Sequence, residues 1–307
     1  MDTYPISSNS LEIYYGINGT QLAQQYKEHL SDFNQWEQKE HSTDWLLFPE
    51  NMGEQLSIDE TALSNGDLYT ILTNKSAKGK KGALVAMIEG TESEKIINVL
   101  KEIEKSVRES VTEVTLDMAG SMNKIVRECF TKASRVTDRF HVQKLAYDAI
   151  QEIRIAYRWD AINTENELMI EAKGLKKKYK AKLFDNGDTE KQKTRAKILF
   201  KKFPDLEKAY NLTHKLRLIY SKTEDKDIAR AKLAVWYNDI EESGFKSFNT
   251  IAATIYTHYP SILIFFDNRS TNASAESFNA KLKAFRRTQR GVSDMKFFLF
   301  RIAKIFA

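Results

Sequence analysis

Short runs of β-forming residues, separated first by turns and then by helical stretches, constrain the fold of this chain most strongly. Five such runs are present, at 56–59, 68–73, 83–88, 111–116 and 133–137. The first three are closely spaced and joined by turn signals such as Asn65-Gly66, which is typical of an antiparallel meander. The last two follow helical stretches, so they are expected to join the sheet through crossovers. The sequence therefore predicts an α/β fold with a mixed sheet in the order βββαβαβ and helices on its faces.

The region from Phe140 to about Tyr259 has a different pattern. Its apolar residues recur at helical spacing, and Pro and Gly are scarce, which predicts helices and no strand. The chain then returns with an apolar segment and a final pair of amphipathic helices. The expected organisation is a helical and linker segment at 1–54, the first part of the α/β domain at 55–140, a helical insertion at 141–260 and the final part of the α/β domain at 261–307.

The composition excludes several classes of protein. Cys129 is the only cysteine among 307 residues, which rules out a disulfide scaffold and a zinc site built on several thiolates. No apolar run approaches the roughly 18 residues of a membrane span. The first ten residues carry no basic segment of the kind that begins a signal peptide. We therefore expect a cytoplasmic protein that does not contact membranes.

The positive charge is concentrated in two places, although the net charge is only +5. Residues 171–202 contain 12 basic and 4 acidic side chains, and a second basic stretch from Lys281 to Arg290 contains no acid. This distribution is typical of a surface that binds a polyanion, although a solvated helix surface would look similar. The candidate phosphate-binding residues are Lys176, Lys177, Lys178, Lys180, Lys182, Lys281, Lys283, Arg286, Arg287 and Arg290.

Three acidic residues could meet at one edge of the predicted sheet. Asp59 and Asp117 come at or near the ends of predicted strands, and Glu276 lies in the first turns of a predicted helix. Clustered carboxylates are the ligands that Mg²⁺ and Mn²⁺ prefer, and two such ions can support in-line phosphoryl displacement. A single Asp at a strand end is more often a turn or cap residue. The sequence offers no Gly-rich phosphate loop or other catalytic motif that would compete.

Two longer motifs sharpen this interpretation. The first contains Leu116-Asp117-Met118 followed by the block Arg135 to Lys144, which reads Arg-Val-Thr-Asp-Arg-Phe-His-Val-Gln-Lys. The second runs from Ser270 to Lys283 and includes Thr-Asn-Ala-Ser-Ala-Glu-Ser-Phe-Asn-Ala-Lys. Together they resemble the DDE transposases of bacterial insertion sequences, in the ISL-type branch, and the resemblance extends from about Trp45 to Ala307.

The resemblance implies a ribonuclease H-like fold with a helical insertion before the catalytic glutamate. It also implies that Asp59, Asp117 and Glu276 are the catalytic triad and hold Mg²⁺ or Mn²⁺, with two ions in the site; Glu60 is an alternative to Asp59. Additional site residues would be Asp138, Arg139, His141 and Asn279. Asp138 could be a further acid, with Arg139 or His141 contacting phosphate, or this block could have a structural role.

The implied activity is cleavage at the ends of an insertion sequence and transfer of the strand to target DNA. The implied partners are the terminal inverted repeats and target DNA, with a homodimer assembled on DNA. No upstream cysteines are present for the zinc module of related transposases, and only residues 16–36 could be the tail of a helix-turn-helix. A separately encoded helix-turn-helix protein is therefore a further expected partner. The alternatives are a ribonuclease H-like nuclease without strand transfer and a catalytically silent DNA-binding remnant.

Overall fold

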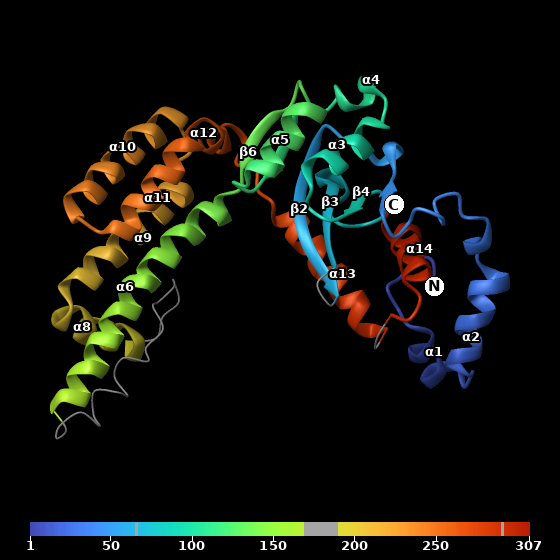
Figure 1. Cartoon of the computed structure of the whole chain (residues 1–307), viewed down its shortest axis with the longest axis horizontal. Coiled ribbons are helices and arrows are strands. Elements are labelled where there is room, and N and C mark those ends of the chain that lie inside the picture. The colour runs from blue at the N-terminus through green and yellow to red at the C-terminus, as the bar shows by residue number, and fades with distance from the viewer. Residues whose placement is uncertain (65–66, 169–189, 290–291) are drawn as a thin grey trace. The chain divides into compact units, whose positions relative to one another are not determined.

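The structure is a computed structural model, and it describes residues 1–64, 67–168, 190–289 and 292–307. The chain forms two compact units (Figure 1). The first contains residues 1–138 and 270–307, and the second contains residues 139–269. The second unit ends later than the boundary at 260 expected from the sequence, because the apolar segment 262–266 continues as part of a helix.

The first unit is built on a six-stranded mixed sheet with the order β1-β4-β3-β2-β5-β6. The strands are β1 (Trp45–Leu47), β2 (Gln55–Ser64), β3 (Asp67–Asn74), β4 (Leu84–Glu89), β5 (Glu113–Leu116) and β6 (Ser134–Thr137). Strands β1 to β4 pair antiparallel, whereas β2, β5 and β6 run parallel. The predicted mixed α/β sheet is therefore confirmed, with β1 as an additional edge strand.

Helices cover both faces of this sheet. One core contains apolar residues of α3 (Ser93–Lys101) and α5 (Gly120–Cys129), together with Leu56, Ile58 and Val114 from the strands. The short helix α4 (Lys105–Arg108) follows α3. The other core contains α13 (Ala273–Thr288) and α14 (Met295–Phe306), which pack on Ile71 and Met87. Because alternate strand residues point to opposite faces, the same strands serve both cores.

The N-terminal segment packs on the end of the chain. It contains α1 (Ser8–Tyr15), α2 (Gly19–Gln25), a π-helical turn (Tyr26–Leu30) and a 3₁₀ turn (Phe33–Gln35). Tyr26 and Phe33 are buried against Phe300 of α14. The buried guanidinium of Arg301 donates hydrogen bonds to the backbone carbonyls of residues 1 and 6, both at 3.0 Å. This segment is therefore part of the first unit.

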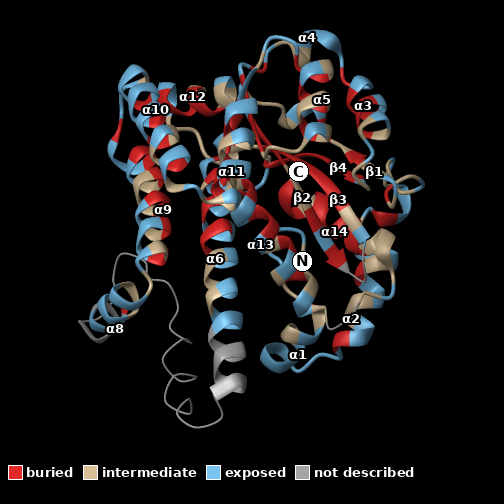
Figure 2. Ribbon diagram, turned by 60° about the vertical axis from the view of Figure 1, so that its left-hand side comes forward, coloured by how far each residue is buried: buried red, intermediate tan, exposed pale blue. Residues whose placement is uncertain are grey.

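The second unit is helical throughout its described residues, as predicted. Its helices are α6 (Arg139–Leu168), α8 (Glu190–Lys202), α9 (Pro204–Lys222), α10 (Lys226–Ser243), α11 (Lys246–Thr257) and α12 (Tyr259–Asn268). Trp236 is fully buried and donates its indole N–H to the carbonyl of Leu212 at 2.9 Å. Figure 2 shows the buried side of each helix in red. No helix among the described residues is long and apolar enough to cross a membrane.

Candidate active site

The register of the parallel strands places three aspartates in one row across the sheet. Ser57 of β2 pairs with Thr115 of β5, so Asp59, two residues further along β2, lies opposite Asp117. Leu116 pairs with Thr137, and the amide of Asp138 donates to the carbonyl of Leu116 at 2.9 Å, so the next residue after each strand also lies in register. Neighbouring strands are about 4.8 Å apart. Neighbouring positions across the sheet are thus occupied by Asp59 within β2, Asp117 directly after β5 and Asp138 directly after β6.

Asp59 lies within β2 and not at its end, which corrects the position expected from the sequence. The strand continues to Ser64 because it pairs with β3 along most of its length, including Asp59 opposite Ile71. The side-chain amide of Asn279 donates to Asp59 Oδ2 at 2.7 Å, and the amide of Glu60 donates to Asp59 Oδ1 at 2.9 Å. Asp59 is therefore held by a residue of α13.

Helix α13 reaches Asp59 because its apolar face packs on the sheet. Phe278, Leu282 and Phe285 are buried in the core on that face. Asn279 is itself only 6% exposed, and its Oδ1 atom is buried without a hydrogen-bond partner. Asn279 is therefore a polar side chain in a largely apolar interface. It points toward the row of Asp59, Asp117 and Asp138, called the acidic row below, and its Oδ1 acceptor is unpaired.

Asp117 directly follows β5, as the sequence predicts. Its Oδ1 accepts a hydrogen bond from the amide of Ala119 at 2.7 Å, which stabilises the turn before α5. The pKa of the nearby Glu60 carboxyl is raised. Burial is the main cause, and the negative charges of Asp117 and Asp59 raise it further. The charges of Asp59 and Asp117 therefore both act on the carboxyl of Glu60.

Asp138, the residue directly after β6, is hydrogen-bonded through its side chain to the start of α13. Its side chain is 2% exposed, and its Oδ1 accepts a hydrogen bond from the amide of Asn272 at 3.2 Å. Asp138 Oδ2 and both polar side-chain atoms of Asn272 are buried without a partner. The two segments that enclose the helical unit in the sequence are thus joined at this point.

Glu276 lies one turn before Asn279 on α13, so the two residues share a face of the helix. Its side chain is exposed and makes no hydrogen bond or ion pair with any other described residue. Over the described ranges, no three carboxylate, imidazole or thiol groups lie close enough together to hold one metal ion. The structure thus places Asp59 and Asp117 at neighbouring positions of the sheet, whereas Glu276 contacts neither of them.

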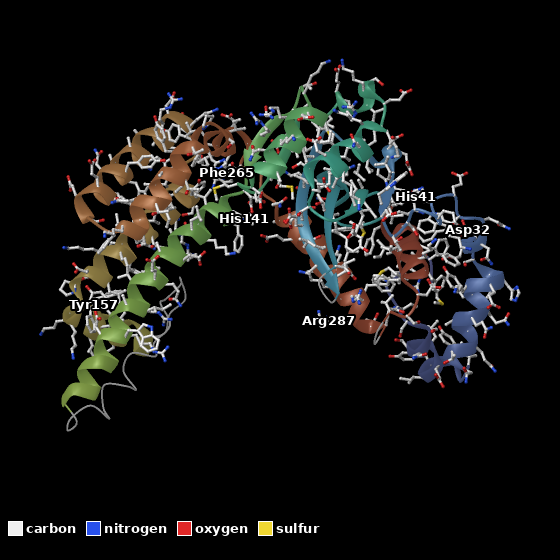
Figure 3. All side chains as sticks on the ribbon, viewed as in Figure 1. Asp32, His41, His141, Tyr157, Phe265 and Arg287 are labelled. Atoms are coloured by element: carbon white, nitrogen blue, oxygen red, sulfur yellow. The ribbon has the colours of Figure 1, made fainter. Side chains whose placement is uncertain are left out.

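Arg139 and His141 begin α6 in the second unit. The guanidinium of Arg139 lies over the ring of Phe265, 6.0 Å from its centroid. The ring of His141 makes an edge contact with Phe140 at 5.8 Å; Figure 3 labels His141 and Phe265. The described contacts of these two residues are therefore internal to the helical unit.

The basic residues expected to bind phosphate have different surroundings. Lys283 and Arg287 are exposed on α13, and Figure 3 labels Arg287 near the end of that helix. Lys281 donates to the carbonyl of Gly79 at 2.8 Å, and Arg286 lies over the Phe298 ring, 6.0 Å from its centroid. The remaining candidates lie outside the described residues: Lys176, Lys177, Lys178, Lys180, Lys182 and Arg290.

A buried polar network was not predicted from the sequence. Lys75 Nζ lies 3.0 Å from Glu113 Oε1 and 2.9 Å from Thr115 Oγ1, and the hydroxyl of Ser270 contacts both Lys75 and Glu113. The Lys75 and Glu113 side chains are 12% and 5% exposed. The only sequence signal is a glutamate at the start of an apolar strand. This network fixes the segment just before α13 on the same sheet.

The model of a family described as transposase, the ISL3-type DDE transposases, matches residues 56–302. The chain belongs to this family. The match spans both parts of the α/β unit and the helical unit between them. A search of curated proteins gave no match.

Membership of the ISL3-type DDE transposases confirms the resemblance, the ribonuclease H-like α/β fold and the transposase activity predicted from the sequence. Enzymes of the DDE type act on DNA and depend on divalent metal ions. The individual roles of the acidic and basic residues stay predictions.

Proposed function

We propose that this transposase cleaves phosphodiester bonds at the ends of an insertion sequence and joins the freed strand to target DNA. Asp59, Asp117 and Glu276 are the proposed metal ligands for two Mg²⁺ or Mn²⁺ ions. The observation that carries this assignment is the parallel register that puts Asp59 beside Asp117, with Asn279 bonded to Asp59. Glu276 lies on the same face of α13, one turn away from that contact.

The residues present suit a hard divalent cation. Carboxylate and amide oxygens are the ligands that Mg²⁺ and Mn²⁺ prefer. The raised pKa of Glu60 is caused first by burial and then by Asp117 and Asp59, so a cation would relieve repulsion at this point. The buried, unpaired Oδ1 of Asn279 is a further oxygen next to the row. Bound metal would supply an activated water and stabilise the leaving oxygen.

The chain's own residues would orient these ligands. Asn279 fixes the rotamer of Asp59 through its 2.7 Å hydrogen bond. Asp138 fixes the start of α13 through Asn272, and the first turn of that helix carries Glu276. Positioning of this kind decides whether a set of ligands is ready for catalysis.

The proposed DNA contacts follow from exposure and charge. Lys283 and Arg287 are exposed on the helix that carries Glu276 and would bind phosphates, which positions DNA without reading its sequence. The basic residues at 176–182 and Arg290 stay in the proposal on charge alone. Arg139 and His141 are proposed as further phosphate contacts. A homodimer on DNA and a separately encoded helix-turn-helix protein complete the proposed assembly.

The assignment is tested with labelled duplexes carrying the inverted repeats that flank the gene. Asp59→Ala, Asp117→Ala and Glu276→Ala should each abolish Mn²⁺-dependent cleavage, while Glu241→Ala, which removes an exposed acid of α10, should leave it unchanged. Calorimetric Mn²⁺ binding by the folded variants provides a readout independent of activity. Full cleavage by any of the three variants would remove that residue from the site.

The same assay separates the two alternative functions. A pre-cut end with a free 3′-hydroxyl should be joined to a target plasmid by a transposase but not by a nuclease that only cuts. A silent remnant would bind DNA in a salt-dependent manner and would neither cut nor join in either metal.

A further inference from the structure

Helix α1 exposes its apolar side chains to solvent. None of its eight residues is buried, and Ile13, Tyr14 and Tyr15 are 84%, 81% and 72% exposed. Figure 2 shows this helix in pale blue and tan. A helix of this length is marginal in isolation, and clustered exposed apolar side chains mark interaction surfaces. Helix α1 therefore presents an apolar surface that no other described residue covers.

The helical unit contains an apolar groove of about 560 Å³ between α9 and α10. Its floor is formed by residues at helical spacing on the two helices: Leu218, Ile219, Ile228, Ala231 and Val235. Three of these are unusually exposed for their size, at 39% for Leu218, 52% for Ile228 and 51% for Val235. Apolar grooves between helices are suited to the apolar face of another helix.

Lysines form the rim of this groove. Lys215, Lys222 and Lys232 line it, and none of its described lining residues is acidic. Lys215 pairs with Asp239, whereas the partner of Lys232 among the residues that the structure describes is the neutral hydroxyl of Thr223, at 3.0 Å. Lys222 makes no ion pair with any other described residue. A helix that fills the groove should therefore carry apolar side chains and at least one acid.

Helix α1 has this chemistry. Residues 1–26 contain the acids Asp2 and Glu12 and no Lys or Arg, in a chain that is otherwise rich in both. Glu12 directly precedes Ile13 and Tyr14 and is exposed beside them. One chain thus carries a groove with a cationic rim and a helix with an acid next to exposed apolar residues, so the two surfaces are complementary in polarity and in charge.

We propose that α1 of one copy docks in the α9–α10 groove of a second copy, with Ile13 and Tyr14 on the apolar floor and Glu12 at Lys222. If two copies exchange their helices, the same contact forms twice and the dimer is closed. This contact would form without DNA and does not depend on the assignment of the catalytic acids. A second copy is favoured over a foreign protein because this chain itself supplies both complementary surfaces.

Sedimentation equilibrium of the DNA-free full-length protein tests the contact. Wild type should dimerise, and Ile13→Asp and Val235→Asp should each weaken the dimer by about 30-fold or more, as expected for a central apolar contact. Tyr256→Asp is the matched control, since Tyr256 is 74% exposed on α11 and does not line the groove. A monomeric wild type, or equal weakening by the control, would overturn the proposal. Thermal unfolding verifies that each variant is folded.

Charge exchange and crosslinking test the direct contact. Glu12→Lys and Lys222→Glu should each weaken the dimer, and the double variant should recover at least part of the loss. In a mixture of two differently tagged proteins, Ile13→Cys on one and Val235→Cys on the other should form a disulfide between copies, since the native Cys129 is buried. No recovery in the double variant, or no disulfide between the two tagged copies, would refute docking between copies.

Discussion

Replacing Asn279 with Ala would show whether α13 controls the acidic row. The amide of Asn279 donates to Asp59 Oδ2 at 2.7 Å in a site where Asn279 is only 6% exposed. A hydrogen bond to a charged group contributes about 1.5 to 3 kcal/mol. At about 1.4 kcal/mol per factor of ten, this corresponds to a change of about 10- to 150-fold. A partner that orients a metal ligand has a similar effect, about 10- to 100-fold.

The expected result is therefore an Asn279→Ala protein whose Mn²⁺ affinity and metal-dependent cleavage fall by about 10- to 100-fold. The assay is calorimetric titration with Mn²⁺ together with cleavage rates over a range of Mg²⁺ concentrations. Ser277→Ala is the control, because Ser277 is exposed on the same helix. Unchanged metal binding in a folded Asn279→Ala protein would refute the role given to this contact.

Asn279→Asp provides the opposite perturbation at the same position. It places a second carboxylate against Asp59, so the metal-free protein should unfold at a lower temperature because like charges repel. Added Mn²⁺ should recover the loss, since an additional anionic oxygen binds a divalent cation. A variant that is equally stable with and without Mn²⁺ would contradict the placement of a cation at this row.

Predictions for three further residues concern stability and reactivity. Asp294→Ala should lower the free energy of unfolding by about 1 kcal/mol, since Asp294 caps α14 through the amide of Phe297 at 2.9 Å. Burial raises the pKa of Asp294, but the hydrogen bond and the charge of Lys27 outweigh burial and hold the pKa low. The carboxylate therefore stabilises the folded protein only while it is ionised. In urea unfolding, the difference in free energy of unfolding between wild type and Asp294→Asn should shrink as the pH falls from about 7 to about 2. Arg301→Met leaves the carbonyls that bind the guanidinium without a donor, and limited proteolysis should cut the first residues of the variant sooner than those of wild type. Burial raises the pKa of Cys129 to about 11, so a thiol reagent should label it only as fast as the protein unfolds.

The sheet shows where sequence pattern suffices and where it does not. The strands from Leu56 onward are bounded by turn signals, and their β-type residues identify them. The edge strand β1 has only three residues, too few to show an alternation. The extension of β2 past Asp59 is also hidden, because Asp and Glu disfavour strands. Pairing with β3, which continues past Asp59 as far as Ser64, outweighs that local preference.

The candidate site also contains features that the sequence predicts and contacts that it does not. The residue types and motif spacing predict Asp59, Asp117 and Glu276 as site residues, but the hydrogen-bond partner of Asp59 lies 220 residues away on α13. No local pattern could predict that contact, which depends on how the apolar face of the helix settles on the sheet. Lys281 is predicted to contact phosphate because it lies in a basic run, and its hydrogen bond to the Gly79 carbonyl is a further contact that the run does not predict. The role of a charged side chain depends on the face of the helix on which it lies, and the number of charges in a run does not give that face.

The contacts around Asp138 and Ser270 explain how α13 can keep its place on the sheet although it follows a large insertion in the sequence. The α/β unit is interrupted after Asp138 and resumes at Ser270. Asp138 bonds the Asn272 amide, while Ser270 joins the buried pair of Lys75 and Glu113. Both junctions are thus fixed by residues of the α/β unit itself, and the position of α13 on the sheet depends on these bonds and its own apolar face. A segment inserted between two points held together in this way can be long without a large entropic cost to the core. The helical unit could therefore diverge in length and surface while the acidic row keeps its register.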